Sequence, residues 1–182
     1  VCMYQGEELG LGEASVAFED LQDPYGITFW PNFKGRDGCR TPMPWEQIDS
    51  SHAGFSDVKP WLPVDDAHKQ QSVAMQTNDS HSILNAYREF MAWRKKQTVL
   101  LEGDIEFIET PEPVLAFYRT LGTQKMLCLF NLSSQQTNID MPTSIVKEYN
   151  ELSHHSAKLS QDRLTLEPFE KPTLPIQDGL SS

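Results

Sequence analysis

The most informative segment of this 182-residue sequence is a polar corner that reads Gly35-Arg36-Asp37-Gly38-Cys39-Arg40-Thr41-Pro42-Met43-Pro44-Trp45. Two arginines four positions apart lie between glycines, which permit a tight backbone, and a tryptophan that closes the segment. A guanidinium held in a rigid turn presents a planar fan of N–H donors to hydroxyl groups or to a carboxylate. The pattern therefore predicts a ligand-binding arginine or a structural ion pair. For Arg40 we favour the ion pair, and the candidate acids are Glu7, Glu8, Glu19 and Asp20.

Residues 1–78, which surround this corner, are rich in Gly, Pro, Asp and Trp and show little periodicity. Such composition predicts long structured loops, which tend to be functional in a compact domain. Trp30, Trp45 and Trp61 are expected to anchor the irregular backbone by burying their rings. The opening run Cys2-Met3-Tyr4 leads into a Gly-rich acidic segment. It predicts either a buried barrel strand that opens into an active-site loop or an edge strand with a solvated turn.

Downstream of the loops the pattern changes twice. Apolar residues recur at close to 3.6-residue spacing between Ser82 and Lys96, with cationic residues in the last turn, which predicts an amphipathic helix. From Asp104 onward, short apolar segments separated by turns predict an antiparallel sheet or sandwich. The expected strands are 105–109, 114–119, 125–131, 137–141, 146–150 and 163–166.

The composition argues against several kinds of partner. With 15 Lys+Arg against 26 Asp+Glu, the net charge of −11 disfavours nucleic acid and anionic membrane surfaces. No apolar run approaches the roughly 18 residues of a membrane span, so we expect no membrane partner. The scattered Cys2, Cys39 and Cys128 suggest reduced thiols and a cytoplasmic setting. The pair His154-His155 has no third ligand nearby, so we expect no metal and no cofactor.

Four ordered segments resemble the α-glucosidases of glycoside hydrolase family 13, the α-amylase family. They are Tyr4-Gln5-Gly6-Glu7-Glu8-Leu9-Gly10, Phe18-Glu19-Asp20-Leu21-Gln22-Asp23-Pro24, the polar corner at 35–45, and Pro60-Trp61-Leu62-Pro63-Val64. The Arg-Thr-Pro-Met-x-Trp unit at 40–45 is typical of the oligo-1,6-glucosidase and α-1,4-glucosidase branch. The similarity runs from residue 1 to about residue 169.

The resemblance implies a fold of class α/β plus β. Residues 1–103 would be the C-terminal part of a catalytic (β/α)₈ TIM barrel, comprising its last strand, a long loop and its last helix. Residues 104–169 would form the antiparallel β-sandwich that follows the barrel, and residues 170–182 a loose tail. A complete barrel needs about 250 residues, more than this chain supplies, so we expect a C-terminal fragment of a longer enzyme.

The resemblance also implies roles for individual residues. Arg36 matches an arginine that reaches the substrate pocket near the scissile glucose, and Asp20 matches an acidic residue beside the second sugar. Tyr4, Glu8 and Arg40 are expected to support the pocket. Family members retain the anomeric configuration with an aspartate nucleophile, a glutamate acid/base and a second aspartate, all from earlier strands. We therefore expect no catalytic residue in this sequence and no hydrolysis by the isolated chain.

The expected parent enzyme removes terminal α-linked glucose from maltose-like or short oligosaccharides. Its partners would be the α-glucoside oligosaccharide substrate and the rest of the parent barrel. A trehalose synthase or a sucrose isomerase shares the same arginine-containing unit and is one alternative. A non-catalytic barrel homologue is another.

Overall fold

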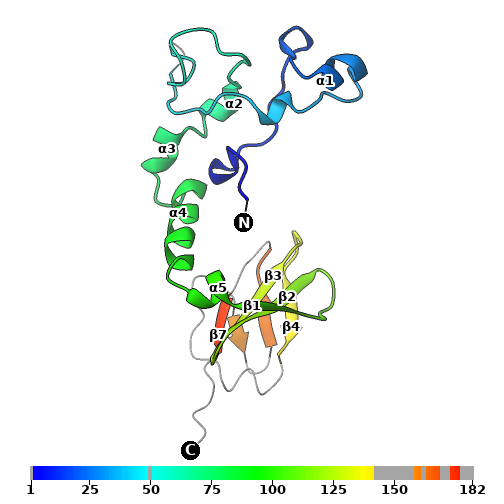
Figure 1. Cartoon of the computed structure of the whole chain (residues 1–182), viewed down its shortest axis with the longest axis vertical. Helices are drawn as coiled ribbons and strands as arrows, with labels where there is room; N and C mark the ends of the chain where they lie inside the picture. Colours follow the sequence, from blue (N-terminus) through cyan, green and yellow to red (C-terminus); the bar gives the residue numbers. More distant parts are fainter. Residues whose placement is uncertain (1, 49–50, 142–157, 161–162, 169–172, 177–182) are drawn as a thin grey trace, which may run out of the picture. The chain divides into compact units, whose positions relative to one another are not determined.

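The computed structural model describes residues 2–48, 51–141, 158–160, 163–168 and 173–176. Contacts within the chain divide it into two compact units, Val1–Ala92 and Trp93–Ser182. Figure 1 shows the first unit as loops and short helices, and the second as sheets. In the described part of the chain, no helix combines the length and apolar character needed to cross a bilayer.

The first unit consists of long loops punctuated by short helices, as the composition predicts. Its helices are η1 (Glu7–Leu9), η2 (Phe18–Asp20), α1 (Pro24–Phe29), η3 (Asp37–Cys39), α2 (Asp66–Lys69), α3 (Val73–Thr77) and α4 (Ile83–Arg94), the last of which crosses into the second unit. The short helices begin at capping residues: Asp23, Asp65 and Ser72 each accept a hydrogen bond from a first-turn N–H. Loops of this length therefore hold defined positions through local hydrogen bonds.

The expected strand at residues 2–4 is not formed. These residues are irregular and lead directly into η1. An extended segment needs a neighbouring strand for its N–H and C=O groups, and no described residue of this chain pairs with residues 2–4. The prediction of a strand at residues 2–4 is therefore wrong for this structure.

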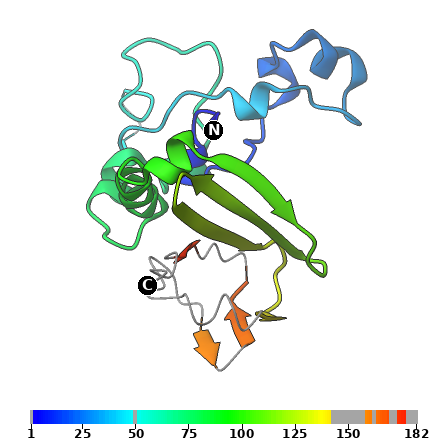
Figure 2. The same ribbon diagram turned by 60° about the horizontal axis from the view of Figure 1, so that its bottom comes forward.

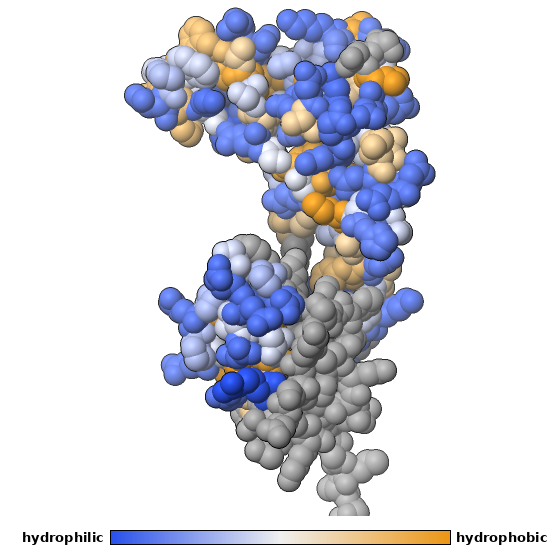
Figure 3. Space-filling view, turned by 180° about the vertical axis from the view of Figure 1, so that it is seen from behind, coloured by the Kyte–Doolittle hydropathy of each residue, from blue (hydrophilic) through white to orange (hydrophobic). Residues whose placement is uncertain are grey.

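The tryptophans of the loops are not the buried anchors that their size predicts. Trp30 and Trp45 are exposed, and Trp61 exposes 67% of its surface. Figure 3 shows hydrophobic side chains interspersed with hydrophilic ones on the viewed face of this unit. The small interior of the unit is built instead by aliphatic residues, with Val16, Leu21 and Leu62 forming one buried cluster.

The predicted helix at 82–96 is confirmed as α4. Ser82 begins it, because its Oγ accepts a hydrogen bond from the N–H of Asn85 at 3.2 Å. A buried glutamine, Gln76, joins three segments at this point. Its amide donates to the carbonyl of Leu9 at 2.8 Å and accepts from the N–H of Leu84 at 2.9 Å.

The second unit contains two antiparallel sheets, as predicted. One has the order β1-β2-β3-β7, with β1 (Asp104–Ile108), β2 (Val114–Leu121), β3 (Gln124–Asn131) and β7 (Thr173–Ile176). The other has the order β4-β6-β5, with β4 (Thr137–Asp140), β5 (Lys158–Ser160) and β6 (Arg163–Leu166). Figure 2 shows the long hairpin of β2 and β3 beside the shorter strands. The strand expected at 146–150 lies outside the described residues.

One core joins the two sheets. It comprises Val114, Ala116, Leu127, Leu129, Met141, Leu164 and Leu166, all nearly inaccessible to solvent. The other face of β2 and β3 packs against α5 (Thr98–Glu102) through Val99, Leu100, Met126 and Cys128. Because each of these strands has apolar residues on both faces, this sheet is sandwiched between the second sheet and α5.

The tail prediction for residues 170–182 is wrong at Thr173–Ile176. These residues form β7, which pairs antiparallel with β3, Met126 opposite Pro175 and Leu127 opposite Leu174. The proline in this segment argues against a strand, but β7 is the outermost strand of its sheet, where a missing N–H is tolerated.

Candidate functional site

The polar corner folds around a buried carboxylate. Asp37 begins η3 and is completely buried, and its Oδ2 accepts hydrogen bonds from the N–H groups of Gln22 at 2.6 Å and Asp23 at 2.7 Å. Its Oδ1 has no hydrogen-bond partner among the described residues. Asp37 therefore fixes the backbone that enters α1 and leaves one buried acceptor atom unused within the described chain.

A second carboxylate, that of Asp23, links α1 to the arginine. Its Oδ1 accepts from the N–H of Tyr25 at 3.0 Å, which caps α1. Its Oδ2 accepts from the backbone N–H of Arg36 at 3.0 Å and lies 3.5 Å from the Nε of the same residue. Hydrogen bonds from Tyr25 and Arg36, together with the guanidinium charge, outweigh the effect of burial and lower the pKa of Asp23.

Two glycines allow these groups to approach. Gly35 has a φ of +73°, and a Cβ at this position would lie 2.9 Å from the Cβ and Cγ of Asp23. At Gly26, in α1, a Cβ would lie 2.5 Å from the carbonyl oxygen of Lys34. A side chain at either position would push α1 away from the polar corner, so only glycine allows this close packing.

The predicted substrate residues Arg36 and Asp20 have different partners. Arg36 keeps 67% of its side chain exposed beside Asp23. Asp20 forms a long ion pair with Lys59, 3.7 Å between Oδ1 and Nζ. Arg40 forms no ion pair with any described residue, so its predicted pairing with an acid at 7, 8, 19 or 20 is wrong. Arg36 is the arginine that is paired, and its partner is an acid that the sequence reasoning did not consider.

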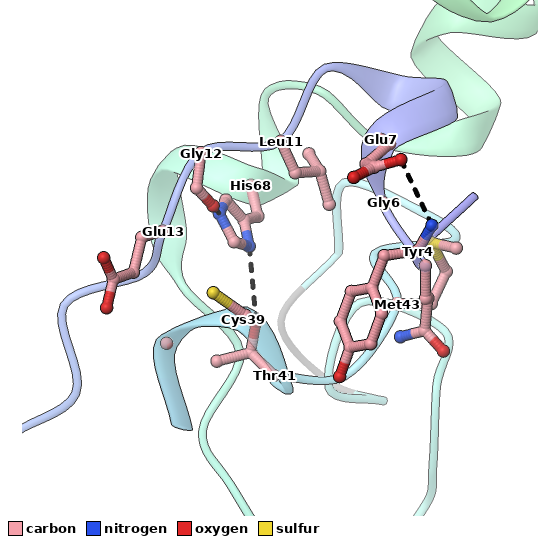
Figure 4. Close-up of a pocket in the computed structure, with 12 residues that line it drawn as sticks. Tyr4, Gly6, Glu7, Leu11, Gly12, Glu13, Cys39, Thr41, Met43 and His68 are labelled. Carbon is pink, nitrogen blue, oxygen red and sulfur yellow. Dashed lines mark hydrogen bonds between the residues drawn. The ribbon is translucent and has the colours of Figure 1, made fainter. Parts of the chain in front are cut away.

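Of the predicted pocket residues Tyr4, Glu8 and Arg40, Tyr4 lines the pocket shown in Figure 4, whereas Glu8 and Arg40 are not part of its lining. The pocket has a volume of about 160 Å³, and its lining includes Tyr4, Gly12, Cys39, Thr41, Met43 and His68. The carboxylate of Glu7 points back to the N–H of Tyr4 at 3.1 Å, and that of Glu8 to the N–H of Gly6 at 2.9 Å. Both glutamates therefore stabilise the turn before η1.

The sequence patterns do not single out His68. This histidine is buried on α2, where one ring nitrogen lies 3.0 Å from the carbonyl oxygen of Gly12 and the other 3.4 Å from the Oγ1 of Thr41. It therefore joins the segment after η1 to the polar corner across 56 and 27 positions of sequence. The one local signal at this position is the capping aspartate, Asp65, which predicts a helix start. It does not show whether a histidine three residues later is buried or exposed.

The lining of the pocket contains several kinds of polar group. Its polar groups can exchange hydrogen bonds with a hydroxylated ligand, and they are the Tyr4 phenol, the Gln5 amide, the Thr41 hydroxyl, the Cys39 thiol, the His68 imidazole and the carboxylates of Glu7 and Glu13. The Glu7 carboxylate also accepts a hydrogen bond from the N–H of Tyr4. No three metal-ligating side chains come together in the ranges that the structure describes. His154 and His155 lie outside those ranges.

These features agree with a family assignment. Residues 1–103 match the family model of the alpha-amylase catalytic domain, and residues 114–170 match that of the C-terminal domain of the alpha-amylase SusG. Since the first match covers more than half of the chain, the chain belongs to the α-amylase family, glycoside hydrolase family 13. The resemblance inferred from the four sequence segments is confirmed.

The chain resembles particular members of the family. A probable alpha-glucosidase of Rhizobium meliloti is 52% identical over 142 residues, which are 78% of this chain and 25% of that protein. An oligo-1,6-glucosidase of Bacillus cereus is 28% identical over 192 residues, covering 92% of this chain and 34% of that protein. The crystal structure of an alpha-glucosyl transfer enzyme, XgtA, aligns with a TM-score of 0.85 and 47% identity, covering 97% of this chain and 32% of that one. The chain thus spans about a quarter to a third of the length of these relatives.

Proposed function

We propose that this chain is the C-terminal part of a retaining α-glucosidase that removes terminal α-linked glucose from maltose-like or short oligosaccharides in the cytoplasm. The observation that carries the proposal is the 52% identity with a probable alpha-glucosidase, together with the catalytic-domain match over residues 1–103. In the longer protein these residues would close the TIM barrel, and residues 2–4 would gain the neighbouring strand that they lack here.

Retention requires two carboxyl groups roughly 5–5.5 Å apart. The acids of the polar corner do not meet this need, because both oxygens of Asp23 accept hydrogen bonds from backbone N–H groups and Asp37 is completely buried. The nucleophile and the acid/base would therefore come from the part of the enzyme before residue 1. This chain would supply binding groups, with Arg36 donating to sugar hydroxyls and Asp20 accepting from the second sugar.

The test is a kinetic comparison of arginine variants in the full-length enzyme that carries this chain. Release of p-nitrophenol from its α-glucoside is measured for the parent, for Arg36→Ala and for Arg88→Ala, a control arginine exposed on α4. Loss of charged hydrogen bonds predicts a fall in kcat/KM of about 10- to 100-fold for Arg36→Ala and none for Arg88→Ala. No release of p-nitrophenol by the parent enzyme would contradict the proposal.

A second candidate function is glucosyl transfer to a sugar acceptor. It is favoured by the 47% identity with an alpha-glucosyl transfer enzyme. Chromatography of the products formed from maltose and from sucrose would separate the two functions. A hydrolase yields free glucose throughout, whereas a transferase or isomerase yields new disaccharides or longer oligosaccharides before glucose accumulates.

A further inference from the structure

The first unit contains two aspartates that begin helices in the same way, and only one of them also holds an arginine. Asp65 accepts from the N–H of Ala67 at 2.7 Å and from the N–H of Ser15 at 3.1 Å. Asp23 accepts from one helical N–H and from one distant N–H, that of Arg36, with nearly the same geometry. The difference is the guanidinium Nε of Arg36, 3.5 Å from Asp23 Oδ2.

We propose that Asp23 is a positioning residue for Arg36, which it fixes by the Nε edge of the guanidinium so that the two Nη groups face the substrate. The inference rests on the proposed function, in which Arg36 contacts the sugar. A carboxylate that binds the backbone N–H and the side-chain Nε of one arginine restricts both ends of a long, flexible side chain. The arginine side chain then loses its conformational entropy when the protein folds, and not when the substrate binds.

The position of Asp23 is itself fixed from several directions. Its own N–H donates to the buried Asp37 at 2.7 Å, and its Oδ1 is held by the first turn of α1. Gly35 provides the close approach on the remaining side. A carboxylate so restrained can orient a partner that is otherwise surrounded by solvent.

The ion pair between Asp23 and Arg36 contributes little to stability, so its role in this proposal is to orient the arginine. Arg36 is 67% exposed on its side chain, and ion pairs at exposed groups contribute little to the free energy of folding. Asp23, by contrast, is buried and has a lowered pKa, so it is a permanent anion at neutral pH. Arg36 makes no further ion pair with the described residues, and its Nη groups remain available.

The test is a double-mutant cycle in the full-length enzyme, using Asp23→Asn, Arg36→Ala and both together. Asp65→Asn is the matched control, because it removes the same charge and one of the two acceptor oxygens, keeps a capping oxygen, and touches no arginine. We expect a similar fall in Tm for Asp23→Asn and Asp65→Asn. Only Asp23→Asn should raise KM for maltose, by about tenfold, and the increase should vanish in the Arg36→Ala background.

Several results would overturn the inference. Equal KM values for Asp23→Asn and Asp65→Asn would do so, as would an Asp23 effect that persists without the arginine or an Arg36→Ala variant with unchanged kinetics. If Asp23→Asn does not fold, Asp23→Ser keeps a capping oxygen but cannot reach Nε, and the same KM comparison applies. Absence of any glucosidase or transferase activity in the parent enzyme would instead refute the proposed function.

Discussion

Replacing Gly35 by alanine tests whether the polar corner depends on a backbone that only glycine provides. Gly35 has a φ of +73°, a conformation that costs a residue with a Cβ about 1 kcal/mol. The new Cβ would also lie 2.9 Å from the Cβ and Cγ of Asp23 and 3.0 Å from its Oδ2. Asp23 cannot move away without weakening its hydrogen bonds to Tyr25 and Arg36, which costs about 1–2 kcal/mol more.

The sum predicts that Gly35→Ala lowers the free energy of unfolding by about 2–3 kcal/mol. Gly122→Ala separates the two contributions, because Gly122 also has a positive φ, +59°, but no described residue beyond its chain neighbours lies within 4 Å of its added Cβ. This control should lose only the conformational part, about 1 kcal/mol.

Both variants can be measured by urea unfolding, with tryptophan fluorescence and far-UV circular dichroism as probes. Three of the four tryptophans lie in the first unit, so fluorescence reports mainly on the unit that contains Gly35. If Gly35→Ala loses no more stability than Gly122→Ala, the close approach of Asp23 to the corner is not what the structure indicates, and the reasoning fails.

Three further predictions concern the interior of each unit. Gln76→Leu should lower the free energy of unfolding, measured in urea, by about 2–3 kcal/mol, because the carbonyl of Leu9 and the N–H of Leu84 lose their partner. The control Gln71→Leu, at an exposed position nearby, should leave the free energy of unfolding almost unchanged. The pKa of Asp23 is lower in the folded state than its unfolded value of 3.8. Its ionised carboxylate therefore stabilises the fold at pH values above 3.8, and this stabilisation is lost as the pH falls through the lower folded pKa. Urea midpoints measured between about pH 5 and pH 2 should therefore fall more steeply for the parent than for Asp23→Asn, and parallel curves would contradict the assignment. Burial raises the pKa of the Cys128 thiol to about 11. Iodoacetamide at about pH 8 should therefore modify the exposed Cys2 and Cys39 in the native protein, and Cys128 only in urea. Mass spectrometry measures the modification of each cysteine.

The sequence predicted the regular parts of the second unit well, because alternation and turn residues are local signals. Strands β1, β2, β3, β4 and β6 start and end within two residues of the expected positions. Among the described strands, two were missed. β5 has only three residues, and β7 contains Pro175, whose missing N–H argues against a strand unless the segment lies at a sheet edge.

The site was predicted less completely, because its decisive contacts join residues far apart in sequence. The role of Arg36 as a paired arginine was foreseen as an alternative, yet its partner is 13 positions away. The Asp-Pro dipeptide at 23–24 is a recognisable helix start, with proline at the first helical position, but it does not reveal what the second carboxylate oxygen binds. His68 and Gly12 meet only because the intervening loops fold back, which no periodic pattern encodes.

The proline in β7 also shapes how this protein can associate with itself. An outermost strand normally offers a row of N–H and C=O groups on which another molecule can extend the sheet. Pro175 has no N–H to donate, and a proline in an outermost strand disfavours such extension, so we expect β7 to be a poor template for it. Versions that end before residue 173 would leave the long strand β3 at the edge of the sheet, and we expect them to oligomerise more readily than the 182-residue chain.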